Sequence, residues 1–191
     1  MYCPKCGILS FFAFIRDTGK LDINSNQFGG PFHDGLFQLP RIRQIFANDN
    51  SELVGTIPEN SSGSIEQVRL GGTKMSGQLP ESLFDLIRCA ELNLERAMFS
   101  GNLSESFAKL RNMAILQLNN NTFTGTIPAA FDEMTHLNVL FLHGNNLAGN
   151  ISTSLCGRRG INFSQLNNLT ADCAGATPVG CNCCTLCYAP P

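Results

Sequence analysis

Residues 116–128 read LQLNNNTFTGTIP, and the same arrangement of residue types returns at a nearly fixed interval along the chain. Counted from Leu116 as position 0, apolar residues stand at positions 0, 2, 7 and 11, asparagine at 5, glycine at 9 and proline at 12. The steps between copies are 24, 23, 24, 24 and 24 residues, with starts at Leu21, Ile45, Val68, Leu92, Leu116 and Leu140. A repeat of this length indicates stacked coils that share a continuous core.

Each position of the frame has a physical role in the folding of one coil. Leu116 and Leu118 alternate with polar residues, so both side chains leave the same face of a short strand and point inward. Asn121 follows where the chain turns off the strand, and its amide can bond to turn backbone groups and to the neighbouring coil. Apolar residues then recur at every third position from Phe131 to Leu137, which predicts a back wall of 3₁₀ character.

The turn positions hold the same residue types in most copies. Asparagine at position 5 is present as Asn26, Asn50, Asn121 and Asn145, with Thr73 and Ala97 in the other two copies. Glycine at position 9 is present as Gly30, Gly77, Gly101, Gly125 and Gly149, with Gly55 one residue late. The proline of position 12 is replaced by His33, Ser104 and Ser152. Two residues are missing around 60–64, so we expect an irregular back wall in the second coil.

These residues resemble the plant-type leucine-rich repeat, LxxLxxLxLxxNxLxGxIP, over roughly residues 20 to 155. The resemblance implies a leucine-rich repeat solenoid of about six coils, a horseshoe with a parallel sheet on its concave face and 3₁₀ segments on its back. Three parts are then expected: an N-terminal segment (1–19), the solenoid (20–155) and a cysteine-rich carboxyl cap (156–191). Recognition of another molecule is the function that the resemblance implies.

The outward positions of the predicted strands form what we call the concave strip. They alternate with the buried positions and hold Asp22, Asn24, Phe46, Asn48, Arg69, Gly71, Asn93, Glu95, Gln117, Asn119, Phe141 and His143. All except Gly71 are candidate ligand-binding residues. Phe46 and Phe141 are expected to be exposed aromatic anchors, with packing against neighbouring coils as the alternative. Glu91, Glu95 and Arg96 could form exposed ion pairs around Arg69, each contributing little to stability.

No catalytic residue is predicted. His143 has no nucleophile or second ligand at a usable spacing, so we expect an ordinary surface histidine. Phosphate-loop, nucleophile-elbow and metalloprotease motifs are absent from the sequence, and no cofactor or metal is expected. The net charge of −2 and the pI near 5.9, without a basic run, argue against nucleic acid as a partner. No apolar stretch is long enough to span a membrane.

The composition changes at residue 156, after which six cysteines follow at Cys156, Cys173, Cys181, Cys183, Cys184 and Cys187. An even number in a short tail predicts three disulfides, for which fifteen pairings are possible. The adjacent Cys183 and Cys184 should each bond elsewhere; a zinc site is the alternative. The tail resembles the cysteine-rich cap of leucine-rich repeat proteins of diatoms and related algae, which implies a secreted protein or a receptor ectodomain. Cys89 falls in the repeat frame and is expected to be a small core residue.

The amino-terminal segment contains half of a zinc knuckle, Cys3 and Cys6. The comparable pair, Cys184 and Cys187, would lie at least about 24 Å away across five strand gaps, so a disulfide or free thiols are expected instead. Residues Ile8–Ile15 form an apolar run that is a weak match to a secretory signal. In one alternative, this run covers the apolar edge of the first coil. In another, the chain is a fragment whose beginning lies further upstream.

Six Asn-x-Ser/Thr sites agree with secretion and glycosylation: Asn60, Asn102, Asn120, Asn150, Asn162 and Asn168. The leading hypothesis is a non-enzymatic recognition module of a secreted protein or receptor-like ectodomain, which binds a protein, peptide or glycan on its concave face. The alternatives are a structural or adhesion protein of the extracellular matrix and an inhibitor of a secreted hydrolase. A cytoplasmic location is the alternative to an extracellular one.

Overall fold

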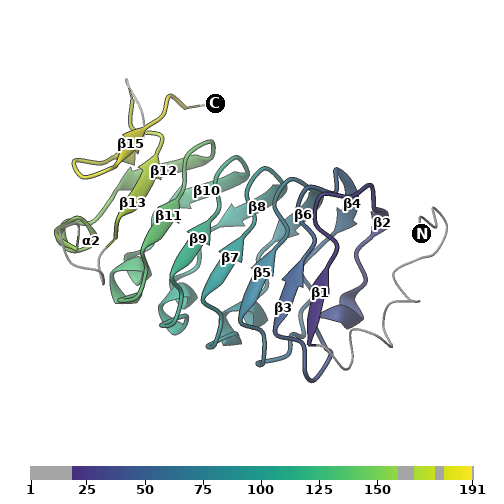
Figure 1. The fold of residues 1–191 in the computed structure, drawn as a ribbon. Coiled ribbons are helices and arrows are strands. Elements are labelled where there is room, and N and C mark those ends of the chain that lie inside the picture. The colour runs from purple at the N-terminus through teal and green to yellow at the C-terminus, as the bar shows by residue number, and fades with distance from the viewer. Residues whose placement is uncertain (1–18, 159–165, 175–178, 191) are drawn as a thin grey trace.

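The structure, a computed structural model, describes residues 19–158, 166–174 and 179–190. Stacked coils contribute strands to two parallel sheets on opposite sides of a shared core (Figure 1), which confirms the predicted leucine-rich repeat solenoid. The first sheet has eight strands in chain order: β1 (Lys20–Asp22), β3 (Gln44–Phe46), β5 (Gln67–Arg69), β7 (Glu91–Asn93), β9 (Ile115–Gln117), β11 (Val139–Phe141), β13 (Asn168–Ala171) and β15 (Leu186–Cys187). It carries the concave strip.

The strand register matches the repeat frame. Leu21 pairs with Ile45, Ile45 with Val68, and Val68 with Leu92, and the pairing continues through Leu116 to Leu140. The 23-residue step therefore leaves the strand register intact, because the missing residues are taken from the back of the second coil. The apolar side chains that face inward along these strands are buried and form one continuous core.

A second sheet of seven strands follows the turn in each coil, and the patterns described above do not predict it. It contains β2 (Gly29–Pro31), β4 (Glu52–Gly55), β6 (Lys74–Gln78), β8 (Met98–Asn102), β10 (Thr122–Thr126), β12 (Asn146–Asn150) and β14 (Val179–Gly180). Glycine lies within these strands at points where the backbone has positive φ, +86° at Gly101 and +79° at Gly125. A side chain at Gly125 would also meet Asn102 Oδ1 of the preceding coil at 2.7 Å.

The back wall consists of short helices, as predicted. These are η2 (Asp34–Leu36), η3 (Glu81–Asp85), η4 (Glu105–Lys109) and η5 (Ala129–Glu133), followed by α2 (Thr153–Gly157). Phe84, Phe107 and Phe131 stack edge to face along the wall, with ring centroids 4.8 and 5.3 Å apart. The second coil has no helix between β4 and β5, which confirms its predicted irregularity.

The three departures from proline at position 12 share one structural role. His33 Nδ1, Ser104 Oγ and Ser152 Oγ accept hydrogen bonds from backbone N–H groups in the first turn of the following helix. The bonds are 3.1 Å long at His33 and Ser104 and 2.9 Å at Ser152. Pro80 and Pro128, at the same place in other coils, make no side-chain cap. The departures therefore exchange a rigid proline for a capping side chain.

The asparagine ladder bonds adjacent coils to each other, as predicted. Asn121 Nδ2 donates to Leu94 O of the preceding coil at 2.8 Å and to Leu118 O at 3.1 Å. Its Oδ1 accepts from the N–H of Phe99 at 2.9 Å. Asn50 and Asn145 make the same pattern of bonds and, like Asn121, are buried.

Asn26 differs from the other ladder residues. Its amide donates only to carbonyls of its own turn, Ile23 O and Asn24 O, and its side chain is exposed. In the third coil, Thr73 replaces asparagine and donates from Oγ1 to Leu70 O at 2.7 Å. Threonine thus satisfies the turn without reaching the neighbouring coil.

The carboxyl cap continues the solenoid instead of only covering its end. β13 pairs with β11, and β15 pairs with β13, so the cap extends the first sheet beyond the six repeat coils. Leu166 and Leu169 are fully buried and extend the core. Cys3, Cys6, Asn162 and residues Ile8–Ile15, for which the sequence made predictions, lie outside the described part of the chain.

The six cap cysteines form three disulfides, Cys156–Cys183, Cys173–Cys187 and Cys181–Cys184. The sulfur atoms of Cys173, Cys184 and Cys187 lie within 4.8 Å of one another. Each of the three sulfurs belongs to a disulfide, so in this oxidation state none is a thiolate that could bind zinc. The predicted set of bridged residues is therefore correct, and the structure selects one pairing.

Cys89 is a buried core residue, as predicted, and the reactivity of its thiol can be used to test this burial. Burial raises the pKa of its thiol to about 12, and Sγ donates to Glu91 O at 3.3 Å. Iodoacetamide at pH 8 should leave Cys89 unmodified in the folded protein and alkylate it in urea, as mass spectrometry of the peptide would show. Rapid alkylation of the folded protein would contradict this burial.

The same shift makes stability depend on pH in the alkaline range. The unfolded thiol loses its proton near pH 8.5, whereas the folded thiol keeps it to about pH 12. The contribution to stability is therefore complete below about pH 8.5 and is lost as the pH rises toward 12. Cys89→Ala should remove this component from the alkaline unfolding profile.

Candidate functional site

In the amino-terminal part of the concave strip, the side chains contact one another and leave little surface for a ligand. Phe46 faces out of the sheet but is only 7% exposed, so the prediction of an exposed aromatic anchor is wrong here. Lys20 Nζ lies 5.0 Å from the centre of its ring, and the Arg69 guanidinium lies 4.5 Å from it. The two cations contact the ring from adjacent strands and shield it from water.

Arg69 also forms a two-pronged ion pair with Glu91. Nε donates to Oε1 at 2.7 Å and Nη2 donates to Oε2 at 2.9 Å. The pairing raises the pKa of Arg69, chiefly through the side-chain hydrogen bond. Glu91 is a buried residue, so the prediction of an exposed pair is wrong for this carboxylate. Lys20 in turn pairs with Asp22 at 2.9 Å, and the charges of this region are matched within the protein.

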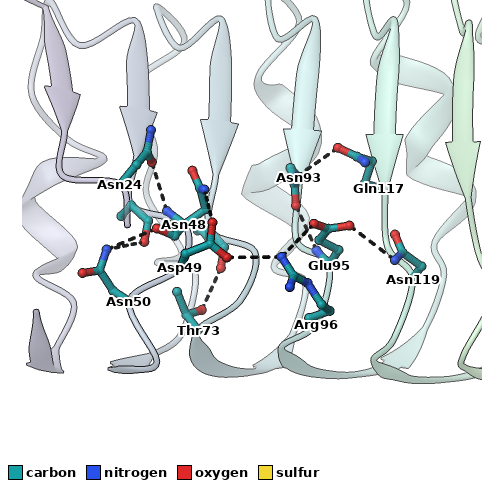
Figure 2. Close-up of polar contacts among 12 residues, drawn as sticks. Asn24, Asn48, Asp49, Asn50, Thr73, Asn93, Glu95, Arg96, Gln117 and Asn119 are labelled. Carbon is teal, nitrogen blue, oxygen red and sulfur yellow. Dashed lines mark hydrogen bonds and ion pairs between the residues drawn. The ribbon is translucent and has the colours of Figure 1, made fainter. Parts of the chain in front are cut away.

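The centre of the strip holds an ion pair that spans three coils (Figure 2). Arg96 Nη2 lies 3.2 Å from Asp49 Oδ1, two coils away, and 3.2 Å from Oε1 of its neighbour Glu95. The coil between them contributes Gly71 and Gly72, which leave room for these side chains. A Cβ atom at Gly71 would lie 2.8 Å from Glu95 Cγ, and one at Gly72 would lie 2.6 Å from Asp49 Oδ1.

Amide side chains connect the next coils (Figure 2). Asn93 Nδ2 donates to Gln117 Oε1 at 2.9 Å, and Asn93 Oδ1 accepts from the N–H of Glu95 at 3.1 Å. Asn119 Nδ2 donates to Glu95 Oε2 at 3.4 Å. Asn119 is only 4% exposed, which corrects its prediction as a ligand contact, because neighbouring coils enclose it. At the other end, Asn24 Oδ1 accepts from the N–H of Asn48 at 3.2 Å.

The next part of the concave strip is an apolar patch formed by Ile115, Val139 and Phe141, which we call the apolar step. Ile115 and Val139 are direct partners on β9 and β11, and Phe141 is paired with Gln117. All four side chains are half-buried, so part of each reaches solvent. Across the described residues, Gln117 Nε2 donates no hydrogen bond. This is the part of the strip where exposed apolar surface adjoins an amide donor with remaining capacity.

The cap closes the carboxyl-terminal end of the strip. The ring of Tyr188 stacks on His143, with centroids 3.9 Å apart and planes 13° apart. Burial lowers the pKa of His143, against the opposing effect of the nearby carboxylates of Asp172 and Glu95. The prediction of an ordinary surface histidine is therefore wrong.

Two cap residues that support His143 were not identified from the sequence. His143 Nδ1 lies 2.6 Å from Thr170 Oγ1, and the Asp172 carboxylate accepts from the N–H groups of Gly144 and Asn145 at 2.8 and 3.1 Å. Thr170 is buried, so this hydroxyl–imidazole pair offers no accessible nucleophile. The step from Leu140 to its partner Leu169 is 29 residues, so this strand falls outside the 24-residue frame. The alternation of apolar and polar residues around Leu169 was the signal that could have revealed the strand.

Comparison with known proteins agrees with this geometry. Residues 89–147 match the family described as Leucine rich repeat. The chain has the fold of a leucine-rich repeat solenoid. Curated proteins give no match to the sequence of this solenoid. Within the described ranges, no helix has both the length and the apolar character required to cross a bilayer.

Several solved plant structures share the fold of this solenoid. The peptide hormone receptor RGFR1 in complex with RGF2 is similar at TM-score 0.70 and 23% identity, over 84% of this chain and 24% of that chain. The Arabidopsis receptor kinase HAESA, in complex with the peptide hormone IDA and the co-receptor SERK1, gives 0.70 and 26%, over 80% and 25%. A plant ice-binding protein gives 0.68 and 22%, over 80% and 47%. The solenoid thus spans about a quarter of the two receptor chains.

Proposed function

We propose that this solenoid is a non-enzymatic recognition module that binds an extended peptide, or an extended segment of a protein, on its concave strip. The observation that carries the proposal is the apolar step beside Gln117. An extended peptide presents one apolar side chain and one backbone carbonyl within a few ångströms of each other. Ile115, Val139 and Phe141 would receive the side chain, while Gln117 Nε2 would donate to the carbonyl.

The closed ends of the strip support this placement of the ligand. Toward the amino end, the cations beside Phe46 are matched by Asp22 and Glu91. Toward the carboxyl end, Tyr188 covers His143. Paired charges and stacked rings gain little from a ligand, because the ligand would first have to replace contacts that exist already. The apolar step has no such cost.

An extracellular location is part of the proposal. Three disulfides in a tail of this length suit an oxidising compartment and not the cytoplasm. Two of the similar solved structures are plant receptors of peptide hormones, which favours a peptide over a glycan here. Membership in a longer receptor-like protein, and the likeness of the cap to algal proteins, remain predictions.

A displayed library of random twelve-residue peptides would test the proposal. Peptides selected on the wild-type protein should bind the double variant Val139→Ser/Phe141→Ser at least about tenfold more weakly, because losing a buried apolar contact costs about 1.5–3 kcal/mol. Calorimetry would measure the change in Kd.

The matched control is Val54→Ser/Met98→Ser. These side chains are exposed at 38% and 48% on β4 and β8, away from the concave strip, and their replacement should leave Kd within about twofold. A library that yields no binder, or binders that lose as much affinity in the control as in the apolar step, would refute peptide recognition at this site. The structural and hydrolase-inhibitor alternatives would then lead.

A further inference from the structure

A polar cavity lies where the second coil lacks its back-wall helix. Its volume is about 490 Å³, within the range of small-ligand pockets. The missing residues let the chain turn inward, and the N–H of Ser62 donates to Phe37 O of the preceding coil at 2.6 Å. The cavity is lined by Asp34, Gln38, Thr56, Ile57, Pro58, Glu59, Asn60 and Gln78. None of these residues belongs to the concave strip, so this is a separate site.

The lining has the chemistry of a sugar-binding surface. Ile57 and Pro58 are buried and give the cavity an apolar base. Two carboxylates, three amides and one hydroxyl surround that base, and the lining contains no basic residue. A pyranose ring presents C–H groups on its face and hydroxyl groups around its edge. Carboxylate and amide oxygens accept from hydroxyls, and amide nitrogens donate to them.

A residue on the rim could bring such a sugar to the cavity. Asn60 begins the sequence Asn-Ser-Ser, an acceptor for N-linked glycosylation. The residue is exposed and lies outside any strand or helix. Throughout the described part of the chain, its side chain has no hydrogen-bond partner. The Nδ2 atom of Asn60 is therefore open to modification.

The other described acceptor asparagines are also exposed, but they differ from Asn60 in their structural setting. Asn102 Oδ1 accepts from Thr124 Oγ1 at 3.0 Å, and Asn150 and Asn168 lie within strands. Asn120 has a left-handed backbone with φ of 55°. Of these described sites, Asn60 is the one that lines the cavity.

We propose that Asn60 carries an N-linked glycan whose first N-acetylglucosamine lies in this cavity. A bond forms between Nδ2 and the anomeric carbon of the sugar while the bond from that carbon to a lipid-linked pyrophosphate breaks, and the amide loses one proton. The proposal rests on the extracellular location given above, because this chemistry belongs to the secretory pathway. Attachment at the rim gives the sugar a high effective concentration, so a few weak contacts keep it in place.

The test uses the full chain secreted from eukaryotic cells behind an added signal peptide. Mass spectrometry of glycopeptides should find Asn60 occupied. Peptide-N-glycosidase should release this glycan from the folded wild-type protein about tenfold more slowly than from the variant Gln38→Ala/Gln78→Ala. Both glutamines are exposed, so the variant keeps its fold, which its unfolding midpoint would verify.

An unoccupied Asn60, or equal rates of release from the wild-type protein and the variant, would overturn the proposal. The double variant Thr124→Ala/Ser100→Ala on the second sheet is the control, and release from it should match the wild-type rate. The added signal peptide brings the chain into the secretory pathway in every case. An unoccupied site would therefore argue against the glycan alone and leave the peptide-binding proposal, measured at the apolar step, unaffected.

Discussion

Replacing Asn121 by alanine should lower the free energy of unfolding by about 3–5 kcal/mol, because each buried group left without a partner costs about 1–3 kcal/mol. The change removes one amide that bonds two coils. The N–H of Phe99 and the carbonyl of Leu94 lose their partner in a place that water cannot reach, whereas Leu118 O keeps the hydrogen bond from Asn145 Nδ2. Urea unfolding followed by circular dichroism would measure the loss.

Two further variants separate the loss of bonds between coils from a general sensitivity of the turn to substitution. Asn26→Ala, at an exposed position that bonds only to its own coil, should cost at most about 1 kcal/mol. Asn121→Asp keeps an acceptor for the N–H of Phe99 but loses the three hydrogen bonds that Asn121 Nδ2 donates, so it should also destabilise the fold. Equal losses at positions 26 and 121 would show that the bonds between coils are not the cause.

Phe107→Ala should destabilise the protein by about 3–5 kcal/mol, because it leaves a cavity in a close-packed core. The ring is fully buried and packs edge to face against both Phe84 and Phe131. The loss therefore interrupts the aromatic contact on both sides, and the neighbouring coils cannot move together without breaking the register of two sheets. Thermal and urea unfolding would both report it.

The controls for Phe107 vary size and burial separately. Phe107→Leu fills much of the space and should cost clearly less than the alanine variant. Met98→Ala removes a side chain that is 48% exposed and should change stability by about 0.5 kcal/mol or less. A loss at position 107 no larger than at position 98 would contradict the packing described for the back wall.

The repeat frame predicts the direction of a side chain much better than its exposure. Leu116 and Gln117 face opposite sides of β9 because neighbouring residues alternate in any strand. The burial of Phe46 depends on Lys20 and Arg69, which come from other coils and are brought together only by the fold. The enclosure of Asn119 has the same kind of cause. Within the candidate site, Phe141 and Gln117 are half-buried, so part of each side chain reaches solvent.

The repeat pattern did not predict the second sheet or the strands of the cap, and the reasons differ. Strands such as β10, with the sequence TFTGT, offer one buried apolar residue and a glycine, a weak signal for a strand. These strands form because stacking places equivalent backbone segments of neighbouring coils side by side, where they can pair. In the cap, the longer step of 29 residues hides the strand that begins near Leu169, although Leu169 pairs with Leu140 as the earlier repeat starts pair with each other.

The short β15 has a consequence for assembly. Any coil of a solenoid resembles the coil that follows it, so an open end is a template onto which another copy could add. β15 offers two paired residues, Leu186 and Cys187, where earlier strands of this sheet offer three or four. The Cys173–Cys187 disulfide holds this shortened edge in place. An incoming copy would therefore meet a shorter and covalently fixed edge at this strand than at any earlier strand of the sheet.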